Sequence, residues 1–299
     1  MFKKSTWLHL RIPFSYFLLP VFLFALAVSV NIDPTRLFIV FVALHIFLYP
    51  ASNGFNSYFD KDTESIGGLK KPPKVTKGLY YMSLVFDVIA IGLGLLISYD
   101  FAIMLFVYGL VSKAYSHPIF RLKKYPYTSW LIAGLFQGWF TFLMAYVGLN
   151  GFSIDLALQP TILIPGLLSS AILWGSYPMT QIYQHKEDKK RGDVTLSYKL
   201  GIRGTFHFTA IVFAIASMGY YFYFANYHSA EYGTHFFIAL APVIGFFTYW
   251  YFLVRKNQEK ANYTFTMWLN AISATCLNAF FIYFFLDSTQ LIQAIQGGF

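Results

Sequence analysis

Residues 35–55 read TRLFIVFVALHIFLYPASNGF, and residues 56–64 continue the chain as NSYFDKDTE. The first stretch is mostly apolar and has about the 20 residues that a helix needs to cross a bilayer. The second stretch brings an amide and three carboxylates directly to its end. Because polar groups at membrane depth are costly and usually face a cavity that they serve, this junction predicts a membrane helix that ends in a polar site.

Apolar segments of similar length recur along the chain and predict nine membrane helices. They cover residues 13–31, 35–56, 79–98, 101–116, 129–149, 161–183, 205–226, 234–254 and 264–286. Of the 299 residues, 57% are hydrophobic and only 12% are charged, which disfavours a soluble all-α protein. We therefore predict an all-α polytopic membrane protein in which nine transmembrane helices form a bundle around a central cavity. We expect a polar cap on the cytoplasmic side and a single domain over residues 1–299.

Two other kinds of membrane-directed sequence are disfavoured. The first apolar segment lacks the small-residue cleavage site of a signal peptide, so we expect it to be a mature helix. The polar–apolar alternation of a membrane barrel strand is absent, which favours a helical bundle. The only cysteine, Cys276, lies within the ninth segment and excludes both a disulfide within the chain and a cysteine-based metal cluster.

The basic residues predict how the chain is oriented in the membrane. If nine helices alternate, 21 of the 22 Lys and Arg residues fall on one side, and Arg36 alone falls on the other. The positive-inside rule then places the N-terminus and the even-to-odd connections in the cytoplasm, and the C-terminus outside. We expect a bacterial inner membrane, whose anionic lipid would also attract this basic face.

Polar side chains gather at the cytoplasmic ends of the second and sixth segments. Asn53, Asn56, Asp60 and Glu64 are spaced by three, four and four residues, which places them along one face of a helix. The end of the sixth segment carries a second set at similar spacing, composed of Thr180, Gln184 and Asp188.

These two sets are typical of a metal–diphosphate site. Carboxylate and amide oxygens suit Mg²⁺, which is usually held by one or two carboxylates together with substrate phosphates. The surrounding Lys and Arg side chains would bind the remaining phosphate oxygens by charge-assisted hydrogen bonds. The alternative is that these groups only solvate helix ends and form salt bridges.

Four motifs in this order resemble the UbiA superfamily of intramembrane prenyltransferases, and the resemblance covers nearly the whole chain. The first motif is Asn56, Asp60 and Glu64, followed by KKPPKVTKG at residues 70–78. The second is QIYQHKEDKKRGDVTLSYKLG at residues 181–201, and the third is YSHPIFRLKK at residues 115–124. Arg11, just before the first segment, resembles a basic position of the family. The chain departs from the family pattern at Ser57, Glu64 and Gln184, each of which stands where Asp is common.

The resemblance implies Mg²⁺-dependent transfer of a prenyl group from its diphosphate to an aromatic, quinone-precursor-like or other lipophilic acceptor, with release of pyrophosphate. It implies one Mg²⁺ held by Asn56, Asp60 and Glu64, and a second held by Asp188 with Gln184 and Glu187. The diphosphate would be bound by Arg11, Lys71 and Lys123, with Lys74, Lys77 and Arg121 as further candidates. Asn56, Asp60, Asp188 and Tyr115 are the expected catalytic residues, and Asn53 would extend the metal or substrate site.

Other readings remain open. The same site would support cyclisation of a prenyl diphosphate, or transfer to a non-aromatic acceptor such as a polyol phosphate or a carotenoid. A transporter or lipid-binding membrane protein is the alternative of another class, and a catalytically inactive member is a further one. Asp87 in the third segment and His45 in the second are either site residues or packing residues. Membrane lipid is the expected surroundings, and we expect neither a nucleic acid nor an obligate protein partner.

Overall fold

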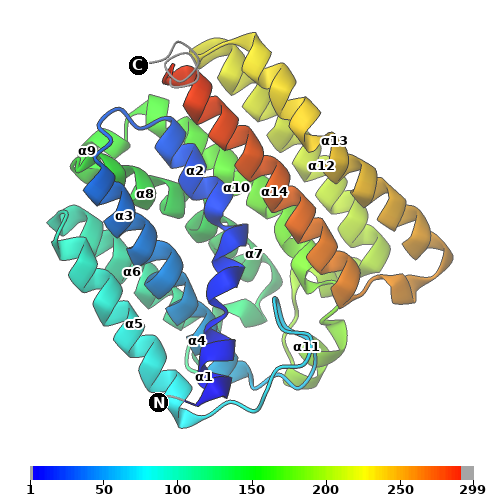
Figure 1. Ribbon diagram of the computed structural model, residues 1–299. Helices are drawn as coiled ribbons and strands as arrows, with labels where there is room; N and C mark the ends of the chain where they lie inside the picture. The colour runs from blue at the N-terminus through cyan, green and yellow to red at the C-terminus, as the bar shows by residue number, and fades with distance from the viewer. Residues whose placement is uncertain (1–2, 291–299) are drawn as a thin grey trace.

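The computed structural model describes residues 3–290, and in this part of the chain every regular element is a helix (Figure 1). Seven helices are long and apolar enough to cross a membrane. They are Pro34–Asp60 (α3, η2 and α4), Lys77–Leu95 (α5), Pro126–Asn150 (α7, η4 and α8), Pro160–Gln181 (α10), Leu196–Tyr227 (α12), Ala230–Lys256 (α13) and Tyr263–Ser288 (α14). The predicted all-α polytopic membrane fold is confirmed.

At the N-terminus, three short helices form two arms, Lys4–Phe17 and Leu19–Ala27, which together count as an eighth span. These are α1 (Lys4–Leu10), η1 (Ile12–Phe17) and α2 (Leu19–Ala27), with a bend of 44° between Phe17 and Leu19. Arg11 separates α1 from η1 in a left-handed backbone conformation, with φ 49° and ψ 43°. Pro13 and Pro20 each stand at the start of the helix that follows a break, where the missing N–H costs no helical hydrogen bond.

The predicted count of nine membrane helices is wrong by this measure. Within residues 3–290 there are seven such helices, or eight if the bent pair is one span. The segment predicted at 101–116 does form a helix, α6 (Tyr99–Ser116), but it is not among them. Asp100 and Lys113 lie within its 18 residues and lower its hydropathy.

The long helices close into a ring around the middle of the molecule. Helices α12, α13 and α14 lie side by side at one side of the bundle, and α5 and α6 lie at the opposite side (Figure 1). Helix α10 packs on α12, and α2 packs on α14. These two contacts connect the α12–α14 side to the rest of the bundle. The space inside the ring holds the cavities described below.

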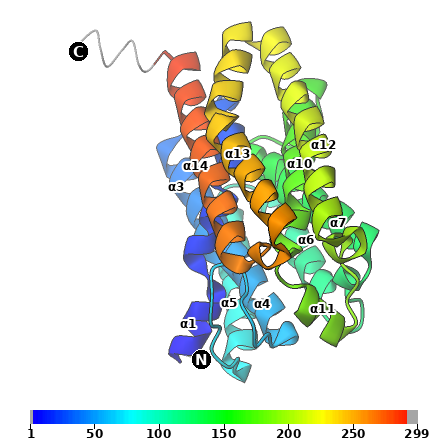
Figure 2. The same cartoon turned by 90° about the vertical axis from the view of Figure 1, so that its right-hand side faces the viewer.

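The connections that carry most of the basic residues share one end of this bundle. Helix α1, the 61–76 connection and α11 (His185–Arg191) lie at this end, whereas the end of α14 lies at the other (Figure 2). The short helix η3 (Leu122–Lys124) connects α6 to α7, and α9 (Ile154–Ala157) lies toward the second end (Figure 1). Helix η5 (Gln258–Lys260) connects α13 to α14.

Two membrane helices contain a π-helical turn. The turns are η2 (Val42–Leu48), between α3 (Pro34–Phe41) and α4 (Tyr49–Asp60), and η4 (Leu135–Phe140), between α7 (Pro126–Gly134) and α8 (Thr141–Asn150). Such turns are often found at functional sites, because they shift the side chains that follow. A Cβ on Gly138 would lie 2.4 Å from the Ser170 Cα, so glycine here allows α10 to pack closely on η4.

Candidate active site

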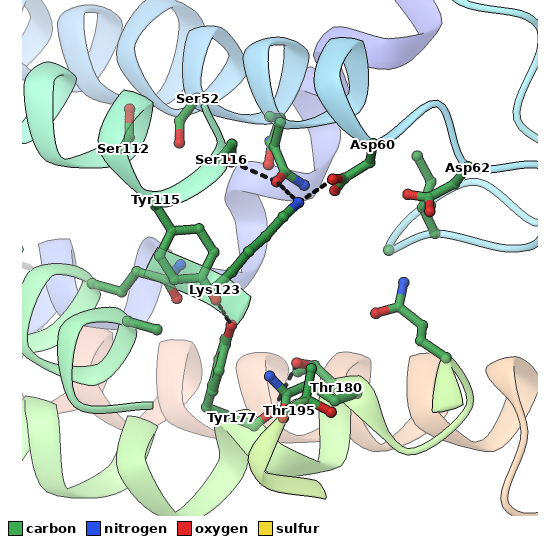
Figure 3. Close-up of a pocket in the computed structure, with 18 of the residues that line it drawn as sticks. Ser52, Asp60, Asp62, Ser112, Tyr115, Ser116, Lys123, Tyr177, Thr180 and Thr195 are labelled. Atoms are coloured by element: carbon green, nitrogen blue, oxygen red, sulfur yellow. Dashed lines mark hydrogen bonds and ion pairs between the residues drawn. The ribbon is translucent and has the colours of Figure 1, made fainter. Parts of the chain in front are cut away.

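A polar cavity of about 240 Å³ opens at the end of the bundle that holds α1 and α11. Its walls come from α4, α6, η3, α10 and α11, which are distant in the sequence but converge here (Figure 3). The carboxylates that line it are Asp60, Asp62, Asp188 and Asp193, and the cations are Arg11, Lys123 and Arg191.

Helix α4 supplies Asn53, Asn56 and Asp60 to the cavity at a spacing that puts them on one face. The helix ends at Asp60, because Lys61 takes a left-handed conformation with φ 52°. The expectation that Glu64 continues this face is therefore wrong: Glu64 is exposed and does not line the cavity. The turn at Lys61 brings Asp62 into the cavity wall instead.

Lys123 is a buried cation, with 8% of its surface exposed. Its Nζ donates to the Asn56 Oδ1 at 3.0 Å and forms an ion pair with Asp60 (Figure 3). The Asn56 Oδ1 also accepts a hydrogen bond of 2.6 Å from the Ser116 hydroxyl. These contacts fix the Asn56 oxygen and the Asp60 carboxylate beside each other at the cavity wall.

The second set of carboxylates is arranged by the end of α11. Gly192 caps this helix with φ 71°, and the chain then turns so that Asp193 faces back toward Asp188. The Arg191 guanidinium lies between them, 2.8 Å from the Asp188 Oδ1 and 3.1 Å from the Asp193 Oδ2, and it also pairs with Asp62. Arg191 thereby joins the segment after α4 to the segment after α10.

Arg121 connects the two sets from outside the cavity wall. Its guanidinium forms two hydrogen bonds with the Asp193 carboxylate, at 2.8 and 2.9 Å, and its Nη2 lies 3.8 Å from the Asp60 Oδ1. Burial alone would raise the pKa of Asp193, but the hydrogen bonds and charge of Arg121 hold that pKa below its usual value. Asp193 is therefore a carboxylate at neutral pH.

Asp188 differs from Asp193 in its ionisation. It is only 3% exposed, and burial raises the pKa of its carboxyl to about 7, although a hydrogen bond from Thr195 opposes the shift. The Arg191 guanidinium also favours the ionised form. Protonation of Asp188 is therefore sensitive to any cation that enters or leaves this part of the cavity.

Arg11 fastens the 61–76 connection across the cavity mouth. Its guanidinium donates to the Gly67 carbonyl at 2.9 Å and to the Asn53 carbonyl at 3.3 Å. The Phe14 ring lies under the turn that contains Gly67 and Gly68, where a Cβ on Gly67 would come within 2.6 Å of it. The short turn at Ile66–Leu69 is therefore held against the cavity by one guanidinium and one aromatic ring.

Two tyrosines form the boundary between α6 and α10. The hydroxyl groups of Tyr115 and Tyr177 are hydrogen-bonded to each other, and both side chains line the polar cavity (Figure 3). A second cavity, of about 530 Å³ and mostly apolar, begins beyond them and runs between α2, α10, α12, α13 and α14. The two cavities share a set of wall residues, which includes Asn53, Tyr108, Gln137, Thr180 and Asn270.

The structure gathers most, but not all, of the predicted site residues. Those that line the polar cavity are Arg11, Asn53, Asn56, Asp60, Tyr115, Lys123, Gln184 and Asp188. Those that do not are Glu64, Lys71, Lys74, Lys77, Arg121 and Glu187. The lysines lie on the exposed side of the 61–77 segment, and Glu187 pairs with Lys190 on the outer face of α11 at 2.8 Å. Their predicted contact with metal or diphosphate is not supported by these positions.

Sequence reasoning missed Asp62, Asp193, Arg191 and Tyr177 as cavity residues. The first three stand within the quoted motifs, so their charge was the available signal. Their orientation depends on the turns at Lys61 and Gly192, which helical spacing does not predict.

The two ambiguous residues lie away from both cavities. His45 is buried among aromatic rings, stacked on Phe41 at 4.8 Å and edge-on to Phe22 and Tyr49. Asp87 on α5 forms an ion pair with Lys113 on α6. Both positions favour the packing interpretation over a role in the site.

The family model described as the UbiA prenyltransferase family matches residues 17–272. The chain belongs to this family. The enzyme class expected from the sequence, a prenyltransferase in an integral membrane protein, is thereby confirmed. A comparison with curated protein sequences found no match.

Solved structures share the fold of this UbiA family member over nearly their whole length. A UbiA homologue from Archaeoglobus fulgidus bound to GPP and Mg²⁺ has a TM-score of 0.66 and 17% identity, covering 94% of this chain and 99% of its own. The same homologue bound to DMAPP and Mg²⁺ has a TM-score of 0.66 and 16% identity, covering 95% and 99%. A structure of digeranylgeranylglyceryl phosphate synthase has a TM-score of 0.60 and 20% identity, covering 94% and 98%.

The oxygen atoms at the cavity wall suit a hard divalent cation in type. Within residues 3–290, no three His, Cys, Asp or Glu side chains meet closely enough to hold a metal ion by themselves. Mg²⁺, however, is commonly bound by one or two carboxylates and completed by substrate phosphates and water. The Asn56 amide, the Asp60 carboxylate and the Asp62 and Asp188 carboxylates all line this one cavity and fit that mode of binding.

Proposed function

We propose that this protein is a Mg²⁺-dependent intramembrane prenyltransferase that moves a prenyl group from its diphosphate to an aromatic or other lipophilic acceptor and releases pyrophosphate. The observation that carries the proposal is the pair of adjoining cavities. The polar cavity, with its carboxylates and cations, adjoins the larger apolar one and shares wall residues with it. A prenyl diphosphate has the same two parts, joined at one carbon.

The diphosphate fits the polar cavity because three cations reach it. Arg11, Lys123 and Arg191 line its wall, and Arg and Lys bind phosphate oxygens by strong, charge-assisted hydrogen bonds. Tyr115 and Tyr177 place two hydroxyl groups near the point where the prenyl chain would begin. Mg²⁺, held by the Asn56–Asp60 and Asp62–Asp188 pairs, would neutralise further charge on the diphosphate.

The reaction that this arrangement supports begins with cleavage of the bond between the first prenyl carbon and the diphosphate oxygen. Both bonding electrons leave with that oxygen, and the cations of the polar cavity stabilise the negative charge as it develops. The allylic cation that remains would lie where the two cavities meet, beside the Tyr108 and Phe14 rings. Aromatic faces stabilise a cation by about 0.5–2 kcal/mol each.

The acceptor would enter at the same junction. Asn53, Gln137 and Asn270 present neutral amide groups there, which can hold a hydroxyl or carbonyl of the acceptor by hydrogen bonds. The acceptor atom forms the new bond to the prenyl carbon and then loses a proton, so that the products are the prenylated acceptor and pyrophosphate. The surrounding helices exclude water, which would otherwise capture the cation.

The basic end of the bundle indicates its orientation. Helix α11, which lines the polar cavity, lies with α1 at one end of the bundle (Figure 2). The connections at this end carry the clusters of Lys and Arg. The positive-inside rule favours a cytoplasmic position for this end, and a bacterial inner membrane is the setting that we propose.

Product analysis tests the proposal. Purified protein in detergent is given Mg²⁺ and prenyl diphosphates of increasing length, each with and without a mixture of phenolic, quinone-precursor and polyol phosphate acceptors. A product whose mass is acceptor plus prenyl group is the expected result. A cyclic or hydrolysed prenyl product without acceptor would replace transfer by cyclisation or hydrolysis. Unchanged substrates with folded protein would contradict the enzymatic proposal and favour transport or lipid binding.

A further inference from the structure

Arg191 occupies the centre of the carboxylates that the proposed function needs. Its guanidinium donates to Asp188 at 2.8 Å and to Asp193 at 3.1 Å, and it pairs with Asp62. Asp62 follows α4, whereas the other two carboxylates belong to the segment after α10. One side chain therefore holds two distant segments of the chain together across the cavity.

The guanidinium and a divalent cation would compete for the same oxygen atoms. An Arg side chain has five N–H donors in a planar fork, and here they are directed at three carboxylates at once. A metal ion that used the Asp62 and Asp188 oxygens would have to displace these donors. Lys123 stands in the same relation to Asp60 and Asn56 in the same cavity.

A displaced Arg191 needs a new partner. Its side chain is only 17% exposed, and arginine cannot shed its charge by losing a proton. A diphosphate in the same cavity offers oxygen atoms whose geometry matches the guanidinium fork. Metal alone would leave the Arg191 guanidinium without its carboxylate partners. Metal and diphosphate together give both the carboxylates and the guanidinium a partner of opposite charge.

We propose that Arg191 acts as an exchangeable counter-cation, which holds Asp62, Asp188 and Asp193 until Mg²⁺ and the prenyl diphosphate arrive together. The inference rests on the proposed function and adds that metal and diphosphate bind cooperatively. Because such coupling is reciprocal, the diphosphate raises the affinity for metal by the same factor by which the metal raises the affinity for diphosphate. The consequence is a carboxylate cluster that stays neutralised between turnovers.

The direct test is the affinity for Mn²⁺ without substrate, measured by electron paramagnetic resonance on the full chain in detergent. We expect R191Q to bind Mn²⁺ more tightly than wild type, by a factor in the range of about 5 to 150 that is typical of coupled sites. K190Q is the matched control, because it removes the same charge one residue earlier, and the Lys190 side chain is 65% exposed and, within residues 3–290, pairs with Glu187 alone. It should change the affinity by about twofold or less, as expected for a surface ion pair.

R191Q that binds Mn²⁺ no better than wild type would overturn the inference. If R191Q does not purify as folded protein, R191K decides in its place, because one ammonium cannot reach all three carboxylates and the affinity for Mn²⁺ should still rise. A second set of titrations repeats the Mn²⁺ measurement with inorganic pyrophosphate present. The Mn²⁺ affinity is then corrected for the metal–pyrophosphate complex that forms in solution. Wild type that binds no pyrophosphate would contradict the proposed function itself. If pyrophosphate binds and raises the affinity for Mn²⁺ by the same factor in wild type and R191Q, the role of Arg191 is contradicted and the proposed function is not.

Discussion

Lys123 and Asp60 form the buried ion pair on which the α4 side of the site depends, and their coupling can be measured by a double-mutant cycle. The Asp60 side chain is 5% exposed and that of Lys123 is 10% exposed. Removing one partner of a buried pair typically costs about 3–5 kcal/mol, because the other charge is left without compensation. Lys123→Met should therefore destabilise the metal-free protein strongly.

The structure sets the expected size of this effect. Arg121 lies 3.8 Å from the Asp60 Oδ1. A charge at that distance contributes about 4 kcal/mol of attraction at an effective dielectric constant of 20. Since Arg121 continues to stabilise the carboxylate, we expect the lower end of the range, about 3 kcal/mol. For a chain of 299 residues that corresponds to a fall in Tm of about 5 °C.

Thermal unfolding in detergent with a chelator present measures all four proteins of the cycle. Asp60→Asn alone should be milder, because Lys123 keeps its contact with the Asn56 Oδ1 at 3.0 Å. The double variant should recover most of the stability that Lys123→Met loses, with a coupling of about 2 kcal/mol or more. If the two single shifts in Tm simply add, the pair carries no coupling and this account of the α4 side is refuted.

Three further predictions concern the rest of the site. The raised pKa of Asp188, about 7, means that its carboxyl is protonated below neutral pH, so Mg²⁺ affinity should rise between pH 6 and 8 with release of a proton. By the same sign, the contribution of Asp188 to the stability of the metal-free protein should fall as pH rises from its ordinary pKa of 3.8 to about 7, because ionisation of this buried carboxyl opposes folding. An affinity for Mg²⁺ that does not change with pH would contradict the raised pKa. Gly67→Ala places a Cβ 2.6 Å from Phe14 and should displace the turn that Arg11 holds. We expect this displacement to raise the KM for prenyl diphosphate several-fold. Gly92→Ala, whose Cβ meets nothing within 4 Å, should leave the KM unchanged. Ala274→Phe fills part of the apolar cavity and should lower kcat/KM for the longest accepted prenyl diphosphate by about 5- to 150-fold, the range expected for overpacking by 1–3 kcal/mol. The kcat/KM for dimethylallyl diphosphate should fall less. Ala279→Phe is the control, because Ala279 is exposed on the same helix.

The sequence predicts the fold well because membrane spans depend on long averages of hydropathy. Each of the nine predicted segments falls on helical structure, and the discrepancy in number arises at α6 and at the bent N-terminal pair. Asp100 and Lys113 lower the hydropathy of α6, and the breaks near Arg11 and Leu18 divide the first span. Averages over a window of residues do not detect breaks of this kind.

The site is predicted less completely, because a single backbone conformation decides which side chain faces the cavity. The spacing of Asn56 and Asp60 is helical and both residues line the wall, but the left-handed turn at Lys61 exchanges Glu64 for Asp62. At α11, the spacing places Asp188 correctly but says nothing of Arg191, whose side chain folds back over the helix end. Contacts between segments more than a hundred residues apart, such as Arg191 with Asp62, have no signature in local periodicity.

The most direct test of the central claim is pyrophosphate release that depends on Mg²⁺ and on Asp60. Wild type and Asp60→Asn, each shown to be folded by thermal unfolding, are assayed with a prenyl diphosphate and the best acceptor found by product analysis. We predict release by wild type that stops when Mg²⁺ is chelated and that falls by about 10²-fold or more in Asp60→Asn, the scale of a lost transition-state contact. Equal release by the two proteins, or release that continues without Mg²⁺, would contradict the account.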